Sequence, residues 1–101
     1  MGAFQLTLYL TGDSAKSQYA LDNLQSILEG QFPGSYELSV VDILEEPHQA
    51  EAQGILATPT LIKQSPSPER RVIGDFSDQD KVLAGLGLAS RGAGTIAAEG
   101  N

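Results

Sequence analysis

The sequence contains no cysteine in its 101 residues, and His48 is its only histidine. Without a thiol, the chain cannot form disulfide bonds, thiolate nucleophiles, cysteine-based zinc sites or iron–sulfur clusters. One histidine is too few for a histidine-rich metal site. The sequence also shows no phosphate-binding loop and no nucleophile–base pair. We therefore expect no metal site, no cofactor and no catalytic residue.

Basic residues are scarce as well. Six lysines and arginines stand against 13 aspartates and glutamates, which gives a formal net charge of −7. We therefore do not expect binding to nucleic acid or to an anionic membrane. No base occurs between Lys16 and Lys63, so most of the positive charge lies in the part of the chain that follows Pro59.

Long apolar runs are also missing. No run approaches the ~20 residues that a membrane-spanning helix needs, and the N-terminal residues lack the pattern of a signal peptide. We expect a cytoplasmic protein. The length and the 41% hydrophobic content predict one globular domain over residues 1–89. Residues 90–101 are rich in glycine and alanine without periodicity, so we expect a disordered tail there.

The first half of the chain predicts a strand, a helix and a second strand. Residues 4–10 alternate between apolar and polar side chains, which is typical of a strand with one buried face. Residues 36–44 contain β-branched side chains that suit a sheet buried on both faces. The helix between them, over residues 15–30, has Asp13 or Ser14 as its expected N-cap. Its predicted apolar stripe consists of Tyr19, Ala20, Leu21, Leu24, Ile27 and Leu28.

The second half predicts a short helix, two more strands and a last helix. The short helix covers residues 48–53, and the strands cover residues 60–63 and 71–76. The two strands are expected to form a hairpin across a proline-rich turn. Ser77 with Asp80 three residues later resembles a capping box, which predicts that the last helix begins there.

A proline stands directly before the third predicted strand. Pro59 has no amide donor, so it marks a loop-to-strand junction, and the Thr58-Pro59 bond is a candidate cis peptide. This junction has two interpretations. It either positions a binding edge or a switch, or it is an ordinary strand start. The stretch alone favours the ordinary strand start. The order βαβαββα with this proline is the thioredoxin topology. Loop 12–17 stands where thioredoxins carry Cys-x-x-Cys and offers hydroxyls instead, which excludes thiol–disulfide exchange.

Several segments between residues 4 and 88 are specific in combination. They cover residues 8–12, 23–24, 27–29, 55–61, 70–71, 73–75, 77–78 and 81–83. In this order they resemble the KaiB family, the circadian-clock proteins of cyanobacteria and their bacterial relatives. The resemblance implies a protein that is not an enzyme and that binds the ring of a KaiC-type hexameric ATPase. It also implies a KaiA-like protein and a sensor histidine kinase as possible further partners.

The resemblance further implies two folds for one sequence, which is physically reasonable when their free energies differ by only a few kcal/mol. The partner-binding form of this family is thioredoxin-like. The alternative is a resting arrangement, βαββααβ, in which everything after about Pro47 is rearranged. We accordingly expect a homo-oligomer, a tetramer or dimer, when the protein is free.

The resemblance carries over to individual residues. Lys63, Arg70 and Arg71 match the basic positions of the family's partner surface. Without the family context, the arginines are surface bases on an edge strand, and Lys63 is an edge lysine that blunts aggregation. The expected switch or structural residues are Gly54, Thr58, Pro59, Gly74, Asp75, Gly85 and Gly87.

Two other functions remain open at this point. One is a divergent, KaiB-like homo-oligomeric adaptor in stress signalling, without a clock role. The other is a cysteine-free thioredoxin-like enzyme, for instance one that holds glutathione through the backbone at Thr58 and Pro59. The sequence also leaves open whether the chain corresponds to a principal KaiB or to a divergent paralogue.

Overall fold

The computed structural model describes residues 3–88, and the predicted tail at 90–101 lies outside this range. Its elements are β1 (Phe4–Leu10), α1 (Ala15–Gln31), β2 (Tyr36–Asp42), α2 (Pro47–Ala52), β3 (Thr60–Ser65), β4 (Arg70–Ile73) and α3 (Gln79–Gly85). The predicted order βαβαββα is therefore confirmed, and this structure does not have the alternative order βαββααβ.

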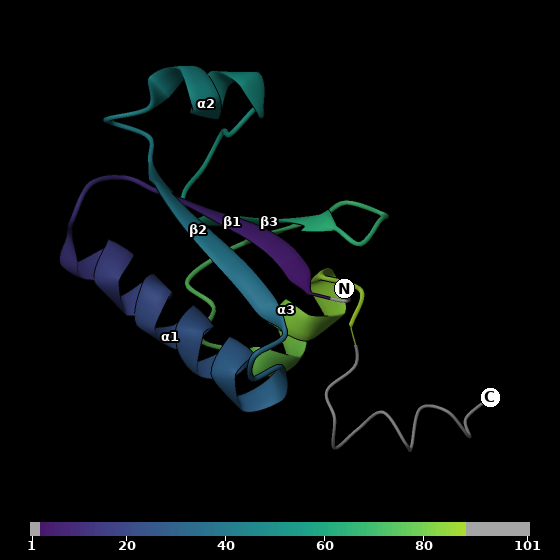
Figure 1. Ribbon diagram of the computed structural model, residues 1–101. Helices are drawn as coiled ribbons and strands as arrows, with labels where there is room; N and C mark the ends of the chain where they lie inside the picture. Colours follow the sequence, from purple (N-terminus) through teal and green to yellow (C-terminus); the bar gives the residue numbers. More distant parts are fainter. Residues whose placement is uncertain (1–2, 89–101) are drawn as a thin grey trace, which may run out of the picture.

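The four strands form one mixed sheet in the order β2-β1-β3-β4. β1 and β2 are parallel, as the strand–helix–strand prediction required, and the other two pairs are antiparallel. Figure 1 shows α1 and α3 on one side of the sheet and α2 on the opposite side, near one end. One face of the sheet is thus covered by two helices, whereas much of the other face has no helix over it.

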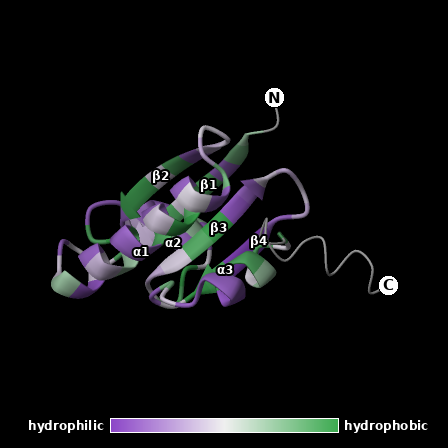
Figure 2. Ribbon diagram, turned by 90° about the horizontal axis from the view of Figure 1, so that it is seen from below, coloured by the Kyte–Doolittle hydropathy of each residue, from purple (hydrophilic) through white to green (hydrophobic). Residues whose placement is uncertain are grey.

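The main core lies between the sheet and the two helices α1 and α3. The alternating Leu6, Leu8 and Leu10 of β1 point into it and are at most 6% exposed. They pack with apolar residues of α1, with Leu61 of β3 and with residues of α3. Figure 2, which views the molecule from below, shows apolar stretches of β1 and β2 next to each other. This side accounts for most of the apolar burial that stabilises the fold.

The opposite face has a smaller core. Tyr9, Val41 and Ile62 are buried there, and Ile43 and Ile55 pack against them. The prediction that the second strand is buried on both faces was wrong, because β2 is an edge strand and Val40 is 49% exposed. Tyr19 was wrongly assigned to the apolar stripe of α1, since it is 53% exposed.

Local hydrogen bonds set the ends of the helices. Ser14 is the N-cap of α1, and its side chain accepts the N–H of Ser17 at 3.1 Å. The N-cap of α3 is Asp78, whose carboxylate accepts the N–H of Lys81 at 3.2 Å. The predicted start at Ser77 was therefore one residue early, because the Ser77 amide is already donated to Asp75.

β4 ends at Ile73, three residues before the predicted end of this strand. The chain turns away at Gly74, whose φ is 144°, and at Phe76, whose φ is 60°. This turn carries the Phe76 side chain back into the main core, where it is 4% exposed. At the far end of α3, a Cβ on Gly85 would lie 2.7 Å from Val72 Cγ2, so the glycine allows the helix to approach β4 closely.

Candidate partner-binding face

The three predicted partner-binding bases occupy three different environments. Arg70 and Arg71 are consecutive residues of β4, so their side chains point to opposite faces of the sheet. Arg70 pairs across the strands with Lys63, on the side of α1 and α3, whereas Arg71 pairs with Ile62 on the other side. The structure therefore does not bring the three bases together into one patch.

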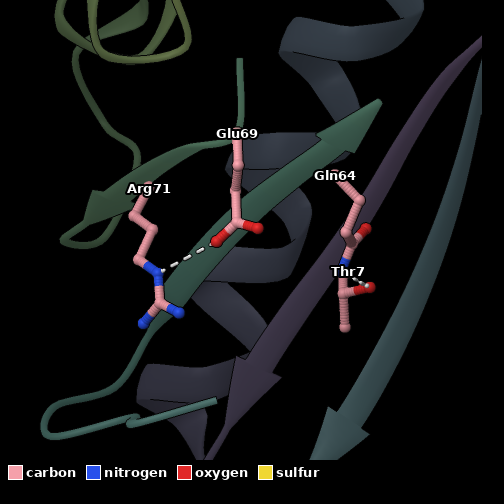
Figure 3. A network of polar contacts seen from close by, with 4 residues as sticks. All are labelled: Thr7, Gln64, Glu69 and Arg71. Carbon is pink, nitrogen blue, oxygen red and sulfur yellow. Dashed lines mark hydrogen bonds and ion pairs between the residues drawn. The ribbon is translucent and has the colours of Figure 1, made fainter. Parts of the chain in front are cut away.

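Arg71 lies on the side of the sheet that lacks helices over most of its area. Its Nε is 3.5 Å from Glu69 Oε2, and this is the one ion pair within residues 3–88. Figure 3 shows these two side chains pointing toward each other, and Gln64 pointing toward Thr7 on the neighbouring strands. Gln64 Nε2 donates to Thr7 Oγ1 at 2.8 Å. Because the Arg71 side chain is 40% exposed, its charge remains accessible to a partner.

Two further residues of this face stand in one row of the sheet. Tyr9 pairs with Thr60, and Thr60 pairs with Ile73. Ile73 is 65% exposed, although it is a large apolar side chain, and Tyr9 is 3% exposed. Burial raises the pKa of the Tyr9 phenol above its ordinary value of 10.0, while the nearby Arg71 charge acts in the opposite direction. Of these side chains, Arg71 and Ile73 are accessible to a partner, whereas the buried Tyr9 packs beneath them. Arginine is enriched at protein interfaces and among their binding hot spots.

We call this surface the uncovered face. It is defined by Gln5, Thr7, Tyr9, Glu37, Gln64, Glu69, Arg71 and Ile73. The edge of this face at β2 is polar, since Gln5 Nε2 donates to Glu37 Oε1 at 3.0 Å. A pocket of about 190 Å³ borders Ile73 on the side of the loop before α3 and is lined there by Asp75, Phe76 and Lys81 among others. The face thus combines an exposed apolar residue, one cation and a polar rim.

Arg70 has a different neighbour. Its Nε lies 3.3 Å from the position that a Cβ would take on Gly87, so its side chain covers the turn after α3. Gly87 has a φ of +75°, a conformation that glycine adopts without strain. Gly87, one of the predicted switch or structural residues, thus lies in the turn that Arg70 covers. Arg70 is exposed, but it does not belong to the uncovered face.

Lys63 is buried, with 3% of its surface exposed. Its Nζ donates to the carbonyl oxygens of Pro66 at 2.5 Å and Pro68 at 3.0 Å. The interpretation of Lys63 as an edge lysine was wrong, because β3 lies between β1 and β4 inside the sheet. In this conformation its ammonium group is also not free to meet a partner.

The Thr58-Pro59 peptide bond at the junction before the third strand, which the sequence left open as a candidate, is cis. Thr58 Oγ1 lies 2.6 Å from Thr11 Oγ1, which joins this junction to the loop after β1. A cleft of about 410 Å³ lies here, and it is lined by Thr11, Ser14, Lys16, Ser17, Thr58 and Pro59. The lining is hydroxyl-rich and contains no thiol, in agreement with the exclusion of thiol–disulfide exchange.

The remaining predicted structural residues lie in turns. Gly54 has a φ of +65° and follows α2. Asp75 accepts the Ser77 N–H at 3.0 Å, and hydrogen bonding from Ser77 lowers the pKa of the Asp75 carboxyl below its ordinary value of 3.8. The Asp75 carbonyl accepts Asn23 Nδ2 at 3.0 Å, which ties this turn to α1.

The sequence analysis did not identify Tyr9, Ile73 or Glu69 as residues of the candidate site. Tyr9 and Ile73 are 64 positions apart in the chain, and only the strand register brings them into one row. The alternation of β1 does place Tyr9 opposite the leucine face, which could have marked it as unusual. Across residues 3–88, no group of three potential ligands is placed to hold a metal, and no helix is long and apolar enough to cross a membrane.

Comparisons with known proteins agree with the fold and identify the family. Two solved structures with the same fold are the N-terminal domain of Synechococcus elongatus SasA and mitochondrial thioredoxin 3 from Saccharomyces cerevisiae. The first has a TM-score of 0.66 and 21% identity and covers 74% of this chain and 71% of its own. The second has a TM-score of 0.67 and 14% identity and covers 86% and 79%. At these identities the likeness shows the fold, which is thioredoxin-like.

Sequence relatives are much more similar. The circadian clock oscillator protein KaiB of Prochlorococcus marinus is 53% identical over 83 residues, which are 82% of this chain and 79% of the relative. The circadian clock protein KaiB3 of Synechocystis is 44% identical over 92 residues, which are 91% and 90% of the two chains. The KaiB domain family matches residues 7–88. On the strength of these matches, which span nearly all the described residues, the chain belongs to the KaiB family.

Proposed function

We propose that this protein is a non-enzymatic regulator that binds a KaiC-type hexameric ATPase through the uncovered face and so adjusts its cycle in circadian timing. The observation that carries the proposal is the position of Arg71, whose accessible charge lies on the same face as the exposed Ile73. The names of the relatives, which are circadian clock proteins, support the clock role.

The charge distribution favours a defined orientation of the partner. The chain carries a net charge of −7, and on the uncovered face Arg71 is the one cation beside the carboxylates of Glu37 and Glu69. Charges at an interface chiefly set the association rate and partner choice, and salt screens them over about 10 Å. An acidic group of the partner would meet Arg71, while an apolar group would cover Ile73.

The family resemblance supplies the rest of the proposal. A KaiA-like protein and a sensor histidine kinase are further partners, and the free protein is a homo-oligomer in the alternative arrangement. If only a small fraction of the free protein has the described fold, the apparent affinity for the partner falls by that fraction. Complex formation is then slow.

The first experiment is size-exclusion chromatography with light scattering. The protein is run alone and after mixing with the KaiC-type ATPase of its own organism, with ATP or ADP, over several hours. We expect a homo-oligomer alone and slow growth of a larger complex in the mixture. A stable homo-oligomer that never joins the ATPase would overturn this function and favour the adaptor.

A matched pair of variants tests the face itself. Arg71→Gln is expected to weaken binding about tenfold, or ~1.4 kcal/mol, and to flatten its salt dependence. Arg70→Gln makes the same chemical change on the neighbouring residue but on the other side of the sheet. It should bind within about twofold of the original protein. Equal losses in the two variants would contradict the assignment of the uncovered face.

A further inference from the structure

Lys63 is the one buried charged residue in the part of the chain that the structure describes. The other two buried polar side chains there, Ser17 and Thr60, carry neutral hydroxyl groups. Burying an ammonium group is costly unless hydrogen bonds replace its water shell. Lys63 stands on the inner strand β3 and on the side of the main core. Its buried charge must therefore be stabilised by neighbouring groups.

The compensation comes from one loop. The two acceptors of Lys63 Nζ are the main-chain carbonyls of Pro66 and Pro68, and no carboxylate of residues 3–88 lies within ion-pair distance of it. The cross-strand neighbour of Lys63 is Arg70, which has the same sign of charge and offers no compensation. The ammonium group thus interacts favourably with the loop between β3 and β4.

This loop has few means of ordering itself. Pro66 and Pro68 have no N–H group, so neither can donate a turn hydrogen bond. No main-chain hydrogen bond within residues 66–69 is present, and all four residues are exposed. The two bonds from Lys63 are therefore the polar contacts that hold Pro66 and Pro68 against the sheet, and the ion pair of Glu69 with Arg71 follows at the end of the loop.

The loop leads directly into the uncovered face. Glu69 follows Pro68, and its carboxylate is the ion-pair partner of Arg71. Glu69 lies directly before β4, and Figure 3 shows its carboxylate directed toward Arg71. An anchor on the Pro68 carbonyl consequently sets the direction in which Glu69 leaves the loop and, with it, the orientation of the Arg71 guanidinium.

We propose that Lys63 is a positioning residue, which acts on partner binding by holding the loop that orients Glu69 and Arg71, without touching the partner. This inference rests on the proposed function for its effect on binding. Its structural half, the anchoring of the loop by the buried ammonium group, can be tested on the protein alone.

The first test uses the free protein. The chain has three lysines, so the ammonium region of a 1H–15N spectrum is simple. Lys63 should give a slowly exchanging ammonium signal, which Lys63→Met removes and the control Lys16→Met retains. Lys63→Met should also lower the 15N order parameters of the Ser67 and Glu69 amides, because the loop moves more freely without its anchor. Its unfolding midpoint should stay equal or rise, because an apolar side chain replaces a buried charge. No protected ammonium signal, or an unchanged loop in Lys63→Met, would overturn the inference.

The second test measures binding to the KaiC-type ATPase. Lys63→Met should bind about tenfold more weakly and with a flattened salt dependence, because the Arg71 guanidinium is no longer held in the orientation that meets the partner. Adding Arg71→Gln should cause little further loss, since the two residues act through one arrangement. Lys63→Arg keeps a donor for the two carbonyls and should restore most of the binding. Full affinity in Lys63→Met would overturn the role in binding.

These outcomes separate the two proposals. If the unaltered protein does not bind the ATPase, the proposed function fails, while the ammonium signal still decides whether Lys63 anchors the loop. If the protein binds but Lys63→Met behaves like Lys16→Met, only the positioning role fails. Should Lys63→Met not fold, the same comparison is made between Lys63→Arg and the original protein. We expect Lys63→Arg to lose less than threefold in binding affinity, and a tenfold loss would contradict the inference.

Discussion

Strand position decides what each basic side chain of this protein can do. Arg70 and Arg71 are neighbours in the sequence and have the same chemistry, but one covers the turn at Gly87 while the other reaches the uncovered face. Lys63, which stands opposite Arg70, is buried and donates hydrogen bonds to the loop between β3 and β4. A run of bases in a sequence is therefore not one surface when it lies on a strand.

Asp75 offers a test of a single carboxylate. Its pKa is lowered in the folded protein, chiefly by hydrogen bonding from Ser77, so the folded state resists its protonation. Asp75 therefore stabilises the fold above pH 3.8, and this contribution is lost as the pH falls through its lowered pKa. Asp75→Asn should make the unfolding midpoint fall less steeply on acidification below pH 4, as measured by urea unfolding at several pH values.

The control for this measurement is Asp13→Asn. Asp13 is exposed, and no hydrogen bond to its carboxylate is present among the described residues, so this variant removes a carboxylate without removing such a contact. If the stability of Asp75→Asn falls as steeply below pH 4 as that of the original protein, the Asp75 carboxylate does not contribute to stability in this way.

The helices depend on specific caps as well as on their apolar faces. α1 is the longest element, and its first turn contains no acidic residue that could favour its N-terminus. Ser14 therefore supplies the side-chain acceptor for this end. The Ser17 hydroxyl also donates to the Thr11 carbonyl at 3.2 Å, which ties the helix start to the end of β1.

Ser14→Ala should lower the free energy of unfolding by ~1 kcal/mol, because the Ser17 amide loses its acceptor. Ser26→Ala makes the same chemical change on an exposed position inside α1 and should raise stability by a few tenths of a kcal/mol, since alanine has the higher helix propensity. Urea unfolding at constant pH measures both. Effects of the same sign in the two variants would contradict the capping role of Ser14.

The whole fold is stabilised mainly on one side of the sheet. Leu61 sits at its centre, fully buried between β1, β4 and the helices, whereas Leu56, five residues earlier, is 98% exposed. Leu61→Ala should destabilise the protein by about 2–5 kcal/mol, and Leu56→Ala should change stability by less than about 0.5 kcal/mol. Thermal unfolding with urea titration measures both.

Binding separates the two leucines further. If Leu56 belonged to the partner surface, Leu56→Ala would weaken binding without changing stability. The proposed face does not include it, so we expect unchanged affinity. A loss of affinity in Leu56→Ala comparable to that in Arg71→Gln would move the interface toward the end of the sheet that carries α2.

The sequence by itself determined the element order, the buried leucine face of β1, the loop-to-strand junction at Pro59 and the absence of thiol chemistry. It also identified the family, which the comparisons confirmed. These properties depend on residue type and on spacing within one element or turn. Local periodicity and backbone chemistry are enough to predict them.

Only the tertiary structure decided which face of the sheet is covered and which bases are accessible. The exposure of Val40, the burial of Lys63 and the row formed by Tyr9 and Ile73 all depend on strand order and register, and the exposure of Tyr19 depends on how α1 packs against the sheet. These are long-range properties, because they arise where segments far apart in the sequence pack together. The same lysine is an exposed charge on an edge strand and a buried anchor on an inner one, and no local pattern distinguishes the two.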